Sequence, residues 1–191
     1  MFQNLMHVQS RFLELHPIAK EDVPFIYDLR TQTSKNYLNP ISPNIQDQYL
    51  YFEKYLERFR EGIEIYYKIL DKQKNKFCGV VRLTEIDKKD IFNWQSLVIA
   101  KGCSPQIGID IMLVIYSLGF ELLNRNVCGP WPVDVRFKEI FQIHNYIGMV
   151  EQANEDERFI DLRVTRDRFL QRIGMFRTRG FGVIGDARTA N

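Results

Sequence analysis

The sequence contains four residues whose side chains are suited to binding a polar small molecule: Arg30, Tyr37, Arg82 and Trp94. Arginine guanidinium groups bind carboxylates and phosphates through paired hydrogen bonds, and aromatic rings stack on sugars and bases. These residues could therefore line a pocket for a sugar, a nucleotide or a carboxylate. The alternative is that the aromatic residues only pack against neighbours and that the arginines are solvated, as in most proteins.

Charge and cysteine content exclude two kinds of site. The chain has 191 residues, with 26 basic and 24 acidic side chains spread along it and a formal net charge of +2. This pattern provides no strong field for nucleic acid, so we expect no nucleic-acid partner. Cys78, Cys103 and Cys128 are odd in number and lack metal-ligand spacing, which predicts no metal site and is typical of a reducing compartment.

The N-terminal residues and the longest apolar run bear on targeting and on membrane insertion. Met1–Ser10 has no basic start followed by an apolar stretch, so we expect no signal peptide and a cytoplasmic location. The longest apolar run, Ile107–Leu123, is interrupted by Asp110 and Glu121 and is shorter than the roughly 20 apolar residues that span a bilayer. We therefore expect a buried helix there and no membrane partner.

Hydrophobic periodicity predicts a single domain over residues 1–173. The expected class is α/β (α+β), with a mixed, mostly antiparallel sheet of about six to seven strands flanked by helices. Helices are expected over residues 20–30, 43–62, 104–124 and 140–148, and after Thr165. Strands are expected over residues 12–17, 63–70, 77–86, 91–100, 127–135 and 158–164, and from Met149. Residues 174–191 contain scattered glycine and arginine and are expected to form a tail that is mobile or docks late on the domain.

This order of elements resembles the GNAT superfamily of acyl-coenzyme A N-acyltransferases over residues 11–170. The stretch LELHPIAKEDVPFIYDLR resembles the first strand and helix of that family. KFCGVVRL resembles its third strand, with the customary glycine at Gly79, and IHNYIGMV is similar to its turn from a helix into a strand. The resemblance is to divergent members that act on small molecules such as amino sugars, or on ribosomal proteins.

Within this resemblance, FNWQSLVIAKGCSPQIGIDIMLVIYSLGF is similar to the fourth strand, the loop and the central helix that hold acyl-coenzyme A in the family. In the family, a splayed strand pair makes room for the pantetheine arm. A tight turn into a helix offers a pyrophosphate free amides and a positive dipole end. The implied donor is acetyl-coenzyme A, held by the strand residues Leu97, Val98 and Ile99 and the loop residues Lys101, Ser104, Pro105, Gln106, Ile107 and Gly108.

The loop departs from the usual family pattern, which is Gln or Arg, two residues, Gly, one residue, then Gly or Ala. Gln106, Gly108 and Asp110 do not fit that pattern. Some relatives have a proline-bearing turn instead, so we interpret the difference as the mark of a subgroup. A carboxylate facing a phosphate would be unfavourable, so we expect the Asp110 side chain to point away.

The resemblance implies two catalytic candidates. His144 lies four residues before Gly148, where the family often has a tyrosine that protonates the leaving thiolate, and an imidazole that titrates near neutrality could do this work. The alternative is a structural histidine satisfied by a neighbouring carbonyl. Glu85 ends the third strand, near the usual place of a carboxylate that accepts the amine proton through water, and its alternative is a solvated turn residue.

The sequence therefore predicts an acetyl-coenzyme A-dependent N-acetyltransferase that acts on a primary amine of a small molecule, with an amino-sugar nucleotide as one candidate acceptor. Asn93 and Gln95 stand where many relatives have a glutamate and a small residue. This difference leaves open a non-catalytic GNAT-like module that binds coenzyme A or a partner protein. A homodimer is a further expectation.

Overall fold

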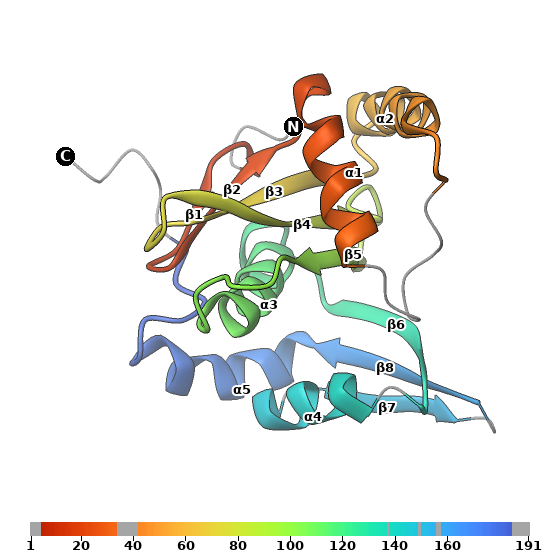
Figure 1. Ribbon diagram of the computed structural model, residues 1–191. Coiled ribbons are helices and arrows are strands. Elements are labelled where there is room, and N and C mark those ends of the chain that lie inside the picture. Colours follow the sequence, from red (N-terminus) through yellow and green to blue (C-terminus); the bar gives the residue numbers. More distant parts are fainter. Residues whose placement is uncertain (1–4, 34–41, 137, 149, 156–157, 185–191) are drawn as a thin grey trace.

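The computed structural model describes residues 5–33, 42–136, 138–148, 150–155 and 158–184. They form one sheet with helices on both faces (Figure 1). The strands are β1 (Val8–Gln9), β2 (Leu13–Pro17), β3 (Ile65–Asp71), β4 (Lys76–Thr84), β5 (Ile91–Ile99), β6 (Val127–Asp134), β7 (Val150–Glu155) and β8 (Phe159–Thr165). The helices are α1 (Val23–Gln32), α2 (Ile45–Arg60), α3 (Ile107–Ser117), α4 (Lys138–Ile147) and α5 (Arg166–Arg177).

The strand order is β1-β2-β3-β4-β5-β6-β8-β7. Neighbouring strands are antiparallel except for β5 and β6, which run parallel. The predicted class and the mostly antiparallel character of the sheet are confirmed. The sheet has eight strands, more than expected, because the two-residue β1 pairs with β2 through Val8–Leu15 and Gln9–Glu14 and is too short to give a sequence pattern.

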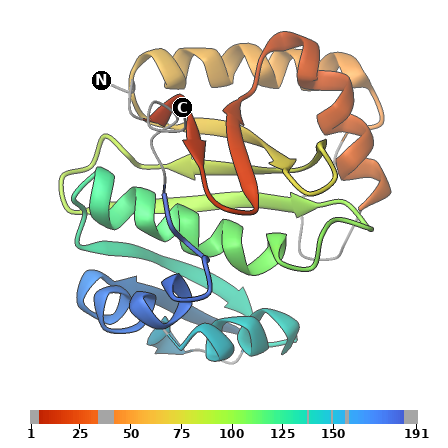
Figure 2. The ribbon, with the colours of Figure 1, turned by 90° about the vertical axis from the view of Figure 1, so that its left-hand side faces the viewer.

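Two helical layers cover the sheet (Figures 1 and 2). Helices α1 and α2 pack on one face, where Ile26 and Phe52 join Tyr66 and Val80 of the sheet in a small core. Helices α3 and α5 belong to the larger core on the opposite face, to which Ile111 contributes. Because α3 lies between the sheet and α5, it is apolar on almost all sides. Among the described residues, no helix is long and apolar enough to cross a membrane.

The C-terminal segment packs on the domain as far as residue 184, which differs from the expected domain end at residue 173. Helix α5 continues to Arg177, and Phe176 is buried. Beyond it, the Gly182 amide donates to Asp110 Oδ1 (2.8 Å), and the Gly182 carbonyl accepts from the Ser117 hydroxyl (3.0 Å). Apolar burial and these hydrogen bonds fix residues 174–184, and the rest of the expected tail lies outside the described residues.

Candidate functional site

The site is built where β5 and β6 separate. Within the described residues, the two strands pair only at Ile91–Val127 and Phe92–Cys128. Beyond these pairs β6 contains Pro130 and Pro132, which have no amide hydrogen to donate to a neighbouring strand. The separation is the splayed strand pair that was predicted, and it leaves the middle of β5 without a partner on that side.

A β-bulge changes the backbone of β5 at the separation. Val98 is opposite Val80 and Gln95 is opposite Arg82, so Ser96 and Leu97 share a single partner position on β4. Ser96 has a φ of 56°, in the left-handed region. A bulge leaves backbone groups outside the ladder. Of the three strand positions proposed to bind the acyl group, Leu97 is the one that lies in the bulge.

A buried carboxylate holds the loop between β5 and α3. Asp71, at the end of β3, accepts hydrogen bonds from the Ser104 amide (2.8 Å) and the Ser104 hydroxyl (3.0 Å). The amides of Gln73 and Lys74 donate to the same carboxylate at 3.0 and 3.2 Å. Burial would raise the pKa of Asp71, but these hydrogen bonds together lower it. Asp71 is therefore a charged anchor beneath the loop.

This anchor occupies both donors of Ser104, and α3 begins at Ile107 and not at the expected residue 104. Ser104 therefore does not cap the helix, whose N-cap is Gln106. The Ile107 amide is also occupied, because it donates to the Ser104 carbonyl (3.0 Å), and the Ile107 side chain is buried in the core. Sequence spacing could not show this, since Asp71 is 33 residues away.

The rest of the loop remains open for an anion. Gln106 and Gly108 lie in the first turn of α3, where helix amides have no intrahelical partner. A Cβ added to Gly102 or Gly108 would meet nothing within 4 Å, so space is free beside the backbone. Lys101 and Pro105 are exposed. An open backbone at the positive end of a helix fits the pyrophosphate of coenzyme A.

His144 faces the separated strands from α4. Its ring lies 5.6 Å from Trp131 of β6, and Trp131 lies 6.2 Å from Trp94 of β5. The His144 side chain is buried, with 3% of its surface exposed, and burial lowers its pKa to about 4. The imidazole is therefore neutral at pH 7, which corrects the expectation that it titrates near neutrality.

A neutral His144 still has hydrogen-bonding capacity. Its Nδ1 atom is buried and has no hydrogen-bond partner among the described residues. A neutral imidazole carries one donor nitrogen and one acceptor nitrogen. The side chain can therefore hydrogen-bond a group placed between the strands, but it holds no extra proton to deliver.

Glu85 lies at the base of the separation, directly after β4. Its Oε2 atom accepts a hydrogen bond from Asn93 Nδ2 of β5 (3.3 Å), and its charge adds to burial in raising the pKa of Cys128 at the start of β6. Glu85 has a φ of 58°, which is uncommon for a residue other than glycine. Asn93 Oδ1 is buried without a partner in the described part of the chain. A carboxylate and an unused carbonyl oxygen therefore meet here.

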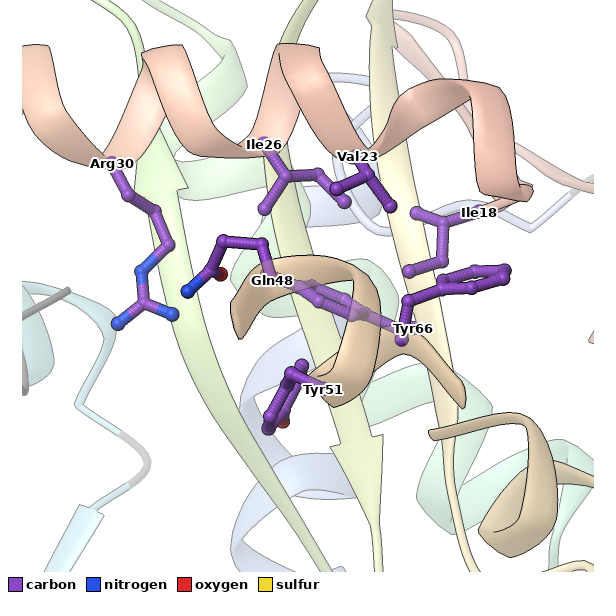
Figure 3. Close-up of a pocket in the computed structure, with 8 residues that line it drawn as sticks. Ile18, Val23, Ile26, Arg30, Gln48, Tyr51 and Tyr66 are labelled. Carbon is purple, nitrogen blue, oxygen red and sulfur yellow. The ribbon is translucent and has the colours of Figure 1, made fainter. Parts of the chain in front are cut away.

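A small pocket, open to solvent, lies between α1, α2 and β3 on the other face of the sheet (Figure 3). It is lined by Ile18, Val23, Ile26, Arg30, Gln48, Tyr51, Phe52 and Tyr66. Figure 3 shows Arg30 reaching from α1 toward the side of the pocket where Gln48 and Tyr51 lie. The pocket thus combines an apolar interior with a polar edge.

Arg82 of β4 adjoins this polar edge. Its guanidinium donates to the Tyr51 hydroxyl and to Gln95 Oε1 (2.7 Å). Arg30 and Arg82 both act on the buried Tyr66, whose pKa is raised by burial against the effect of these two cations. Arg30 and Arg82 therefore lie on the same side of the sheet, each within electrostatic range of Tyr66.

The other two residues of the expected pocket are placed differently. Trp94 alternates to the opposite face, where its ring lies 6.3 Å from that of Tyr116 on α3, so it does not join Arg30 and Arg82. Tyr37 lies outside the described residues. Trp131, which sequence analysis did not single out, lines the separated strands beside Trp94. The only sequence signal for Trp131 is its position between two prolines.

Asp110 is turned toward the protein interior. Its carboxylate accepts hydrogen bonds from the Ser10 hydroxyl and from the Gly182 amide (2.8 Å), and burial raises its pKa. It therefore joins the N-terminal and C-terminal segments to α3 instead of facing the open loop. Within the described residues, no group of three or more His, Cys, Asp or Glu side chains is placed to hold a metal ion.

Comparison with known proteins supports a fold assignment. No protein-family model and no curated protein matches the sequence. Among solved structures, the apo form of FdhC, described as a nucleotide-linked sugar GNAT, has a TM-score of 0.79 and 19% identity, covering 92% of this chain and 98% of that one. Spermidine N-acetyltransferase from Vibrio cholerae with coenzyme A and spermine has a TM-score of 0.65 and 17% identity, covering 83% and 98%. The chain has the GNAT acetyltransferase fold, as its element order predicted.

Proposed function

We propose that the protein transfers an acetyl group from acetyl-coenzyme A to the primary amine of a small molecule, with an amino-sugar nucleotide as the candidate acceptor. The observation that carries this proposal is the Glu85–Asn93 pair at the base of the separated strands. The fold likeness also supports it, since one neighbour is described as a nucleotide-linked sugar GNAT and another was solved with coenzyme A and spermine.

The donor would be held mainly by backbone groups. Gln106 and Gly108 offer amides at the start of α3, and the exposed Lys101 can add a favourable charge. The space between β5 and β6 would take the pantetheine arm, with Trp94 and Trp131 on its walls. When bound, acetyl-coenzyme A supplies an acetyl group activated as a thioester.

The chain's own residues divide the chemistry between them. Glu85 accepts the proton that the attacking amine must lose, directly or through water, and Asn93 keeps its carboxylate in place. The Leu97 amide, in the bulge, can donate to the acyl oxygen as negative charge develops on it. The proton that Glu85 takes from the amine is the one that the departing sulfur gains, passed on through water, and the neutral His144 can donate a hydrogen bond to that sulfur.

A second candidate function is a non-catalytic module that binds coenzyme A or a partner protein. The occupied amides of Ser104 and Ile107 favour it, because they reduce the number of backbone donors left for a pyrophosphate. Catalytic turnover separates the two functions, since both allow a ligand to bind. The homodimer and the cytoplasmic location stay predictions from the sequence.

The first test is thermal unfolding with and without millimolar acetyl-coenzyme A, because a ligand that binds only the folded state raises the midpoint. A rise supports donor binding, and no rise at saturating ligand contradicts both candidate functions that use coenzyme A. Amines are then screened for acetylation with the wild type, Glu85→Gln and His144→Ala. The exposed Glu57→Gln on α2 is the matched control. Turnover that Glu85→Gln leaves unchanged would remove Glu85 from the mechanism.

A further inference from the structure

We infer that the acceptor carries an anionic group, a phosphate or a carboxylate, which binds Arg82 at the edge of the α1–α2 pocket while the amine of the same molecule faces Glu85. This inference rests on the proposed function and specifies its substrate class. It makes Arg82 a specificity-determining residue, and it makes polyamines poor acceptors.

The register of the sheet places the two binding groups on one face. Arg82 pairs with Gln95 and Thr84 pairs with Asn93, so Gln95 and Asn93 are two residues apart on β5 and point to the same side. This separation is about 7 Å along a strand. Glu85 is bound to Asn93, and Arg82 is bound to Gln95. The Arg82 guanidinium and the Glu85 carboxylate are thus each bound to one of two neighbouring positions on the same face of β5, and in this inference one small amino-sugar phosphate contacts both.

Arg82 is held in position by a buried acidic residue. Glu64 is 4% exposed, and its carboxylate lies 3.6 Å from Arg82 and 3.0 Å from Arg58. The Arg82 side chain is itself only 15% exposed, so an anion bound there would be weakly screened by water. A guanidinium has five N–H donors, more than its contacts with Tyr51 and Gln95 require. Arg82 is fixed and retains capacity for a ligand.

The charge around the pocket favours an anion. Of the ionised side chains that act on Tyr66, Arg30 and Arg82 are cations and Glu64 is the anion, and Glu64 is shared with Arg58. Two guanidinium groups therefore lie beside the pocket, Arg30 in its lining and Arg82 bound to Tyr51. A second ammonium group of a polyamine would be repelled by these guanidinium groups. A phosphate would be attracted, because a guanidinium can donate two parallel hydrogen bonds to it. The half-buried Tyr51 adds aromatic surface for a sugar or base.

The test compares a neutral amino sugar, two amines that carry an anionic group, and a polyamine. Acetylation is followed with acetyl-coenzyme A and glucosamine, glucosamine 6-phosphate, glucosaminic acid or spermidine. We expect kcat/KM for at least one anionic amine to exceed that for glucosamine and spermidine by about tenfold or more, equivalent to about 1.4 kcal/mol. Equal or better use of glucosamine or spermidine would overturn the inference. The phosphate and the acid separate the two kinds of anion.

Variants then assign the preference to one side chain. Arg82→Gln should raise KM for the anionic amine and reduce its advantage to about twofold or less, while Arg82→Lys should keep part of it. Arg60→Gln removes the same charge from the exposed side of α2 and should leave the preference unchanged. A preference retained by Arg82→Gln would overturn the assignment.

Donor binding is measured in the same proteins, so that the two proposals fail separately. Acetyl-coenzyme A should raise the unfolding midpoint of Arg82→Gln as much as that of the wild type. No rise in the wild type contradicts the proposed function. A normal rise, with no extra stabilisation by glucosamine 6-phosphate or glucosaminic acid and no preference in turnover, contradicts only the anionic acceptor.

Discussion

The two proposed anion sites differ in the groups that would bind the anion: the loop before α3 has backbone amides, whereas the side of the sheet next to α2 has guanidinium groups. In the loop, Gln106 and Gly108 lie at the positive end of a helix and Asp71 holds the turn from below. Beside α2, Arg82 is held by Glu64 and bonds Tyr51, which lines a pocket with an apolar interior. A backbone site tolerates changes of sequence, because any residue supplies an amide. A side-chain site changes its specificity with one substitution.

The largest effect should follow removal of the anchor beneath the loop. Asp71→Ala leaves the Ser104 amide and hydroxyl without their partner, and each unsatisfied buried group costs about 1–3 kcal/mol. We expect a loss of about 3 kcal/mol in the free energy of unfolding, measured in urea, together with the loss of thermal protection by acetyl-coenzyme A.

Asp110→Ala is the matched control for this prediction, because Asp110 is equally buried but binds Ser10 and Gly182 instead of the loop. It should also destabilise the fold and yet keep the protection by acetyl-coenzyme A. Equal loss of protection in both variants would show that the loop depends on general stability and not on its anchor.

The next effect is a pH dependence from His144. Its folded pKa of about 4 lies below the unfolded value of about 6.5, so the unfolded chain binds more protons between these values. Stability should therefore fall as pH falls from 6.5 toward 4, and the loss at pH 5 should be about 2 kcal/mol.

Urea unfolding at pH 7 and pH 5 measures this loss. His144→Phe should remove most of the difference between the two pH values, whereas His16→Asn, at a half-buried histidine on β2, should keep it. An unchanged difference in His144→Phe would mean that another group is responsible.

A negatively charged side chain introduced into the loop should have a smaller effect, confined to the affinity for acetyl-coenzyme A. Gly108→Glu has open space for its side chain and would put a carboxylate where the pyrophosphate is proposed to bind. We expect acetyl-coenzyme A affinity, measured by calorimetry, to fall by about tenfold with the fold intact. Gly108→Ala is the control, because it adds bulk without charge, and it should bind nearly as well as the wild type. Undiminished binding by Gly108→Glu would place the pyrophosphate elsewhere.

The smallest effect is expected at Lys101. Its side chain is exposed, so its attraction to a phosphate is screened by water and salt. Lys101→Ala should weaken acetyl-coenzyme A by about threefold or less in the same calorimetric measurement. A much larger loss of affinity would mean that the loop binds acetyl-coenzyme A mainly through the Lys101 side chain. The loop would then not differ in kind from the proposed side-chain site at Arg82.

The sequence by itself determined the order of helices and strands and the buried central helix. These follow from local signals, since apolar residues recur with the period of a strand or a helix and the links between strands are short. For the same reason the GNAT fold could be identified from the order of elements. The two-residue β1 escaped prediction, and the sequence left open whether residues 174–184 are mobile or docked, because both segments are held by contacts distant in the sequence.

Only the tertiary structure decided the hydrogen-bond partners, the burial and the placement of the side chains in the candidate site. Ser104 and Pro105 have the local pattern of a helix start, but Asp71 competes for the Ser104 donors across the sheet. The pKa of His144 is set by its burial. Trp94 packs against α3, on the opposite face of the sheet from Arg82, because neighbouring side chains alternate across a strand. Local patterns specify elements, whereas hydrogen-bond competition and desolvation depend on which residues the fold brings together.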